Sequence, residues 1–230
     1  MEENNMTEEE KIIDKAFKDC MERGWIQELI PSIITNREIA DLEAKYQWRI
    51  PSLYKAFLTS YQLPCDMFRI CGITYSYEEL SPLWLNLYGG SSIDKLIENI
   101  EFFIKDAKES RGAILESCRM LLPIGDWGAG WGPLCIDLSK DEALVDRGDT
   151  STWSLVWFDH EEFNWGEDYL GEDGLLHGRS AAPTLEELLK WYFSGSLEAE
   201  FEKENDVKVN YERLNSMEFC SSYWEDKWKK

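Results

Sequence analysis

The sequence predicts an α+β fold, and the order of its periodic segments is the main reason. Helical periodicity dominates the first third of the chain and returns near residue 185, whereas short apolar runs typical of strands gather between residues 121 and 158. Helices that precede and follow a group of strands, without regular alternation, are typical of α+β proteins. A stretch with four glycines, GDWGAGWG, lies among the expected strands and indicates a turn between two of them.

Three helices are expected before residue 62. Thr7 and Glu10 form a capping box ahead of a first helix that Gly24 ends, and Asn36 is expected to cap the second. Pro51 suits the first turn of the third helix. Their apolar residues recur at helical spacing: Ile12, Ile13, Ala16, Phe17 and Cys20; Ile39, Leu42 and Tyr46; Leu53, Tyr54, Phe57, Leu58 and Tyr61.

The middle of the chain combines strands with one long helix. Ser91 is expected to open this helix, whose apolar face runs from Ile93 to Ile104. The apolar runs around Gly72 predict a hairpin or two edge strands, and the run before Asp159 is expected to be buried on both faces. The expected strands span residues 68–71, 74–77, 121–122, 134–138 and 154–158.

A last helix and a charged extension are expected at the C-terminal end. Thr184 and Glu187 form a second capping box, and Gly195 ends the helix. We therefore predict three parts: residues 1–35 as a helical segment packing on the domain, 36–195 as the domain, and 196–230 as a charged helical extension.

The glycine-rich stretch does not fit a phosphate-binding loop. A G-x-G-x-x-G motif starting at Gly128 would need its third glycine where Pro133 stands, and LCIDL, which follows, has a strand pattern instead of a helical one. No G-x-x-x-x-G-K-[ST] motif occurs either. Asp126 is expected to bond the amides of its own turn. We predict a strand, a tight turn and a second strand starting near Pro133, and we predict no cofactor.

Charge is the most unusual global property, because 45 acidic and 24 basic residues give a net charge of −21. Such a protein repels nucleic acids and anionic membranes and attracts basic partners. Acidity is also typical of proteins that need only solubility. The sequence shows no apolar run long enough for a membrane span, no secretory signal, and six cysteines without a C-x-x-C pair, so a cytoplasmic location with free thiols is expected.

Residues 159–173, hereafter the acidic loop, concentrate this charge. They contain seven acidic residues, no Lys or Arg, and three aromatic residues, which predicts either a partner-binding surface or a solvated excursion. The chain also has eleven tryptophans, and tryptophans in loops are candidates for interface anchors, with packing as the alternative. The predicted partner-binding residues are Asp126, Trp127, Trp131, Asp159, Glu161, Glu162, Trp165, Glu167, Asp168, Glu172 and Asp173.

The sequence offers little to an enzyme. It has two histidines and no H-E-x-x-H motif. On an extended segment Asp159 and His160 would point to opposite faces, so they are not expected to share a metal. Carboxylates of Asp126, Asp137 and Asp159 meeting at strand ends remain an alternative. No catalytic or metal-binding residue is predicted.

Four segments, in order and at sensible spacing over about residues 36–195, resemble the SUKH superfamily: IPSLYKAFL, LLPIGDWGAGWGPLCIDL, SLVWFDHE and TLEELLKWY. Members of that superfamily usually carry an Asn-Gly pair soon after the first of these helices, where this chain reads TSYQLP. The resemblance implies a central, mostly antiparallel sheet flanked by helices, and no chemistry of its own.

The superfamily includes fungal cell-wall assembly regulators and bacterial immunity proteins, so the resemblance also implies a function. We expect an immunity-type protein that neutralises a cognate basic toxin domain, possibly a nuclease, through an acidic and aromatic face. The alternatives are a regulatory scaffold of the same fold with another basic protein partner and, third, a hydrolase.

Overall fold

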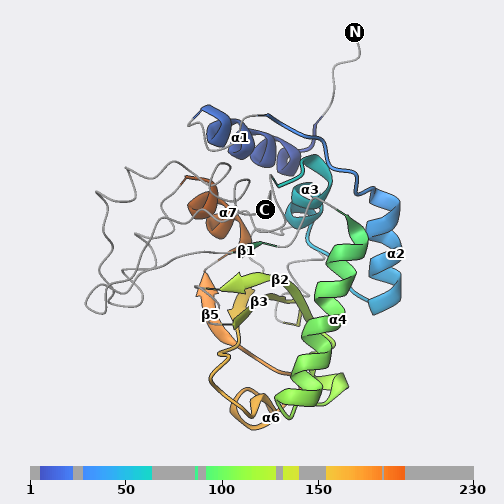
Figure 1. Cartoon of the computed structure of the whole chain (residues 1–230), viewed down its shortest axis with the longest axis vertical. Helices are drawn as coiled ribbons and strands as arrows, with labels where there is room; N and C mark the ends of the chain where they lie inside the picture. Colours follow the sequence, from blue (N-terminus) through green and yellow to red (C-terminus); the bar gives the residue numbers. More distant parts are fainter. Residues whose placement is uncertain are drawn as a thin grey trace, which may run out of the picture.

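A five-stranded antiparallel sheet forms the centre of the fold (Figure 1), with its strands in chain order. The computed structural model describes residues 6–22, 28–63, 86–87, 92–127, 132–139, 154–182 and 184–194. The strands are β1 (Asn86–Leu87), β2 (Leu121–Trp127), β3 (Gly132–Asp137), β4 (Ser154–Trp157) and β5 (Arg179–Ala182). The α+β class with an antiparallel sheet, predicted above, is confirmed.

Helices cover the sheet on more than one side. They are α1 (Glu8–Glu22), α2 (Asn36–Tyr46), α3 (Ser52–Ser60), α4 (Ile93–Ser110), the 3-10 helix η1 (Leu115–Cys118), α6 (Trp165–Asp168) and α7 (Leu185–Ser194). In Figure 1, α1, α3 and α7 gather at one end of the molecule, α4 runs along the sheet, and α6 lies at the opposite end. The acidic loop therefore lies far from the N-terminal helix.

The helix starts follow the predicted capping chemistry, with two shifts of one residue. In the first box the backbone N–H of Glu10 donates to Thr7 Oγ1 at 3.1 Å, and that of Thr7 donates to the Glu10 carboxylate at 2.8 Å. Thr35, one residue before the predicted Asn36, caps α2. The reason is that Glu38 stands three residues after Thr35 and returns a hydrogen bond to it, whereas the residue three after Asn36 is apolar. Ser92, and not the predicted Ser91, caps α4, and its Oγ accepts from the backbone N–H of Lys95 at 3.1 Å.

The glycine-rich stretch joins β2 to β3, as predicted. The two strands pair antiparallel from Leu121 opposite Asp137 to Trp127 opposite Gly132. β2 is longer than the sequence indicated because it continues through Pro123, and the register shifts between Pro123 and Gly125. A proline lacks the N–H that a ladder needs, and a β-bulge at this point lets the strand continue.

Alternate residues of the central strands supply two separate cores, one on each face of the sheet. Leu155 and Trp157 of β4 pack with the residues of α1, α2, α3 and α7, whereas Val156 and the following Phe158 pack with Phe103 of α4 and with the acidic loop. Burial on both faces of this strand, expected from its continuous apolar run, is confirmed. The sheet is thus a middle layer, and the acidic loop belongs to the layer that covers its second face.

Helix α1 packs against α3 and α7. The Tyr61 hydroxyl donates to the Asp14 carboxylate at 2.6 Å, and the rings of Phe17 and Tyr61 lie 5.0 Å apart. These contacts attach the N-terminal helix to the rest, although the proposed boundaries at residues 35 and 195 stay predictions. The strands expected at 68–71 and 74–77, the position of Ser91 and the extension 196–230 lie outside the described residues.

Gly132 marks the point where the start of β3 touches the end of β4. Its φ is +152°, and a Cβ placed there would lie 1.7 Å from the carbonyl oxygen of Phe158. We predict that Gly132→Ala lowers the free energy of unfolding by about 1–3 kcal/mol, as overpacking does, measured by urea denaturation.

Gly174→Ala is the matched control. Gly174 also has a positive φ, +77°, but nothing lies within 4 Å of its Cβ position. The control therefore carries only the backbone strain of an L-residue at positive φ, about 1–2 kcal/mol. A Gly132 variant no less stable than the Gly174 variant would contradict the close approach of Gly132 to Phe158.

Candidate functional site

The acidic loop is folded around a buried tryptophan. Trp165, the first residue of α6, is 1% exposed, and its indole Nε1–H donates to the carbonyl oxygen of Asp159 at 3.0 Å. Its ring lies 5.2 Å from that of Phe158 and 6.3 Å from that of Phe103 on α4. Because its N–H is bonded to Asp159 and its ring packs against Phe158 and Phe103, Trp165 attaches the first half of the loop to the second core.

Tyr169 makes a second internal tie. Its hydroxyl accepts a hydrogen bond from the backbone N–H of Asp159 at 3.2 Å, and its ring meets that of Phe158 edge-on at 5.1 Å. Burial, with help from the nearby Glu162 carboxylate, raises the pKa of Tyr169 to about 12. The hydroxyl therefore stays neutral at physiological pH and adds no charge to the loop.

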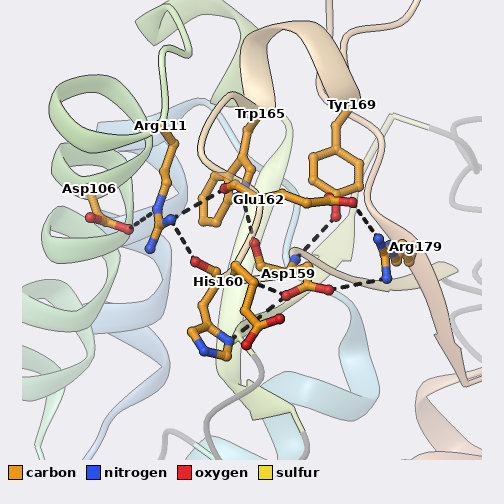
Figure 2. A network of polar contacts seen from close by, with 9 residues as sticks. Asp106, Arg111, Asp159, His160, Glu162, Trp165, Tyr169 and Arg179 are labelled. Carbon is orange, nitrogen blue, oxygen red and sulfur yellow. Dashed lines mark hydrogen bonds and ion pairs between the residues drawn. The ribbon is translucent and has the colours of Figure 1, made fainter.

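Two arginines from other parts of the chain reach the acidic loop from opposite sides (Figure 2). Arg179 of β5 pairs with Asp159 Oδ2 at 3.2 Å and with the Glu162 carboxylate. Arg111, directly after α4, donates through Nη1 to the carbonyl oxygens of His160 at 2.7 Å and Glu162 at 3.3 Å. Because planar guanidinium groups hold several acceptors at once, these side chains fix the start of the loop.

Two glycines let the loop approach the end of α4 at backbone contact. A Cβ on Gly166 would lie 2.4 Å from the carbonyl oxygen of Gly112, and the Gly166 N–H donates to the carbonyl of Arg111 at 3.4 Å. No other residue type fits at Gly166 without moving one of the two segments. Local sequence patterns cannot indicate this contact, because the partners are more than fifty residues apart.

These ties divide the predicted acidic residues into two groups. Asp159 and Glu162 face inward and are paired with Arg179. The exposed group has no side-chain partner among the described residues and consists of Glu161, Glu167, Asp168 and Glu172. Asp173 is exposed but accepts hydrogen bonds from His177 and from the N–H of Leu175.

The predicted aromatic residues are placed differently from the expectation. Trp165 is buried, so its ring is not available to a partner in this structure and its evident role is to support the loop. Phe163, which was not among the predicted residues, is 79% exposed. Its ring lies 5.9 Å from the guanidinium carbon of Arg111. The exposed aromatic group among the described residues of the loop is therefore a phenylalanine two residues away from the predicted tryptophan, and Leu170 is exposed as well.

The start of β3 and the acidic loop approach one another at Gly132. The Cβ position of this glycine lies within 3.3 Å of the His160 backbone nitrogen, and Phe158 N–H donates to the carbonyl of Pro133 at 3.2 Å. Asp126 is half-buried in β2, opposite Pro133, so it lies in a strand and not in the turn where it was expected. The backbone of Trp127 lies in β2, but its side chain and all of Trp131 lie outside the described part of the chain.

Among the described residues, no group of three or more His, Cys, Asp or Glu side chains is placed to hold a metal ion. The expectation that Asp159 and His160 point to opposite faces of an extended segment was wrong. His160 lies in a turn, and its Nδ1 is 3.9 Å from Asp159 Oδ1. In the described part, no helix is long and apolar enough to cross a membrane.

The model of the SMI1 / KNR4 family (SUKH-1) matches residues 33–191 of the chain. This range is most of the chain and contains the sheet, the helices from α2 to α6, the first part of α7 and the acidic loop. No curated protein matches the chain.

A pair of variants tests whether the acidic loop is stabilised by its buried tryptophan. We predict that Trp165→Ala lowers the free energy of unfolding by about 3–5 kcal/mol, because it empties a core position. Phe163→Ala in the same loop should cost less than about 1 kcal/mol, since it removes an exposed ring and one weak cation–π contact. Urea denaturation measures both, and equal losses would contradict the described burial.

Proposed function

Because the chain belongs to the SMI1 / KNR4 family (SUKH-1), we propose that it is an immunity-type protein that binds and neutralises a cognate basic toxin domain. In this proposal the protein has no chemistry of its own and acts by covering its partner. The family is consistent with an immunity-type or a regulatory protein. The choice of a toxin partner is our inference from charge and from the surface of the acidic loop.

The observation that carries the proposal is a set of exposed carboxylates that have no side-chain partner among the described residues and that lie on a loop held by internal contacts. Glu161, Glu167, Asp168 and Glu172 are exposed, and the two arginines that reach the loop are engaged with other acceptors. Together with the net charge of −21, such a surface attracts a basic protein and speeds its encounter. A toxin that binds nucleic acid presents a basic surface of this kind.

The loop is also suited to binding because it is already ordered. Association costs free energy wherever side chains and loops must be immobilised, and a surface held in place beforehand avoids part of that cost. Here Trp165, Tyr169, Arg111 and Arg179 hold the backbone from Asp159 onwards. We place Phe163 at the centre of the partner contact, since a large exposed aromatic ring among charges fits the anchor of an interface.

The proposal is tested with the protein encoded immediately upstream in the native genome. Co-expression should protect cells from that protein, and the purified pair should bind with a dissociation constant that calorimetry can measure. Failure to protect and to bind would contradict the immunity proposal. It would favour the second candidate, a regulatory scaffold of the same fold, whose basic partner would then be sought by affinity purification from the native host.

Charge on the acidic loop is predicted to control the rate of association with this partner. A fourfold neutral variant should associate about tenfold more slowly at low salt, and high salt should remove the difference, because steering is electrostatic. Stopped-flow kinetics measures the rates. The variant carries Glu161→Gln, Glu167→Gln, Asp168→Asn and Glu172→Gln. Glu162 is left intact because it pairs with Arg179.

The control removes the same charge from the distant end of the molecule, around α1 and α2 (Figure 1). Its positions form no ion pair within the described part of the chain and are Glu9→Gln, Glu22→Gln, Glu28→Gln and Asp41→Asn. If the two variants slow association equally, the effect belongs to net charge alone, and the acidic loop is not the contact surface.

A further inference from the structure

His177 lies between two carboxylates from different elements. Its Nδ1 is 3.2 Å from Oδ2 of Asp137 at the end of β3, and its Nε2 is 3.0 Å from Oδ2 and 3.1 Å from Oδ1 of Asp173 in the acidic loop. Asp137 is 1% exposed, and the His177 side chain is 24% exposed. Neither contact takes part in the partner surface proposed above.

Both carboxylates also accept hydrogen bonds from other groups. Oδ1 of Asp137 accepts from the backbone N–H of Ser139 at 3.0 Å and from the Ser139 hydroxyl, and Oδ2 is the oxygen that lies near the imidazole. Asp173 Oδ1 accepts from the N–H of Leu175 at 3.0 Å, and this bond, with a contribution from His177, holds the pKa of Asp173 below its ordinary value.

Only one protonation state of the ring satisfies this geometry fully. A neutral imidazole has one N–H donor and one bare nitrogen acceptor, whereas an imidazolium donates from both nitrogens. A neutral ring at this place would set a lone pair against one carboxylate. The neighbouring thiols of Cys118 and Cys135 do not alter this balance, because burial raises the pKa of each and keeps them uncharged.

The ring also packs against the small loop of residues 170–176. Residues Leu170 and Leu176 form an isolated antiparallel bridge, and the N–H of Gly171 donates to the carbonyl of Leu175 at 2.8 Å. The Leu176 N–H donates to the carbonyl of Ser117, in η1, at 2.9 Å. His177 is packed closely against this loop, since a Cβ on Gly171 would lie 2.6 Å from its Cδ2. Its imidazole is thus the side-chain link between the loop and β3.

We propose that His177 is a proton-sensitive latch: when protonated, it ties the end of the acidic loop to the buried carboxylate of Asp137, and when neutral, it releases one of its two carboxylates. The latch is therefore closed when both ring nitrogens carry a proton and weakened when only one does. This inference goes beyond the proposed function and does not rest on it.

The first test uses the chain's two histidines as a matched pair. Urea unfolding of the wild type, His177→Gln and His160→Gln is followed from pH 5.5 to 8.5. The ratio of the wild-type unfolding constant to that of His177→Gln should be about three- to tenfold lower at pH 5.5 than at pH 8.5, because the closed latch stabilises the wild type at low pH. This magnitude is that of one partly exposed charged hydrogen bond. His160→Gln, which removes the exposed histidine of the acidic loop, should follow the wild type.

The second test reads the ring directly and does not depend on a stable variant. In the wild type, the imidazole ¹⁵N shifts of His177 should report both nitrogens protonated at pH 6 and a loss of one proton at higher pH. Asp173→Asn should weaken this preference for the doubly protonated ring. A single neutral tautomer of His177 throughout pH 5.5–8.5, or a ratio of the wild-type to the His177→Gln unfolding constant that does not change over this range, would overturn the latch.

Discussion

The contact of the Trp165 indole with the second face of the sheet is the constraint on which the surface of this protein depends. The strands β3 and β4 are apolar on both faces, and one face is covered by α1, α2, α3 and α7. The other face would lie open to water without α4 and the acidic loop. Burying Trp165 and Tyr169 there turns a segment with seven carboxylates into a layer of the fold.

This arrangement separates the two roles of the acidic loop. Its aromatic residues that point inward, Trp165 and Tyr169, supply apolar contact, and Asp159 and Glu162 pair with Arg179. The remaining carboxylates are directed to solvent on a backbone that cannot easily rearrange. A fixed array of like charges destabilises a compact state through self-repulsion, and the buried rings offset that cost. The outward charges are what we propose a basic partner meets.

Much of the fold could be predicted from local patterns. Capping boxes placed the starts of α1 and α7, apolar periodicity placed α2, α3 and α4, and the glycine-rich stretch indicated the β2–β3 turn. These features depend on residues close together in the sequence. The one-residue error at Thr35 arose because Asn36 was considered alone, without the hydrogen bond that the Thr35 N–H donates to the Glu38 carboxylate. The bulge that carries β2 past Pro123 needs the partner strand, and periodicity cannot reveal it.

The candidate site was harder to predict because its structure depends on distant residues. Composition locates the acidic loop but cannot show which of its rings turn inward. The sequence therefore predicts an exposed Trp165 and does not single out Phe163. The clamps on the loop, Arg111 and Arg179, come from outside it, and the contact of Gly166 with Gly112 exists only in three dimensions. The link from His177 to Asp137 likewise joins residues forty positions apart.

Hydrogen exchange of the free protein tests the central claim, that the acidic loop is a folded layer. The account predicts that the amides of Tyr169, Gly171 and Leu176, which donate to Trp165, Leu175 and Ser117, exchange as slowly as those of strand β4. Exchange of these amides at the rates of an unstructured peptide, while β4 stays protected, would contradict it.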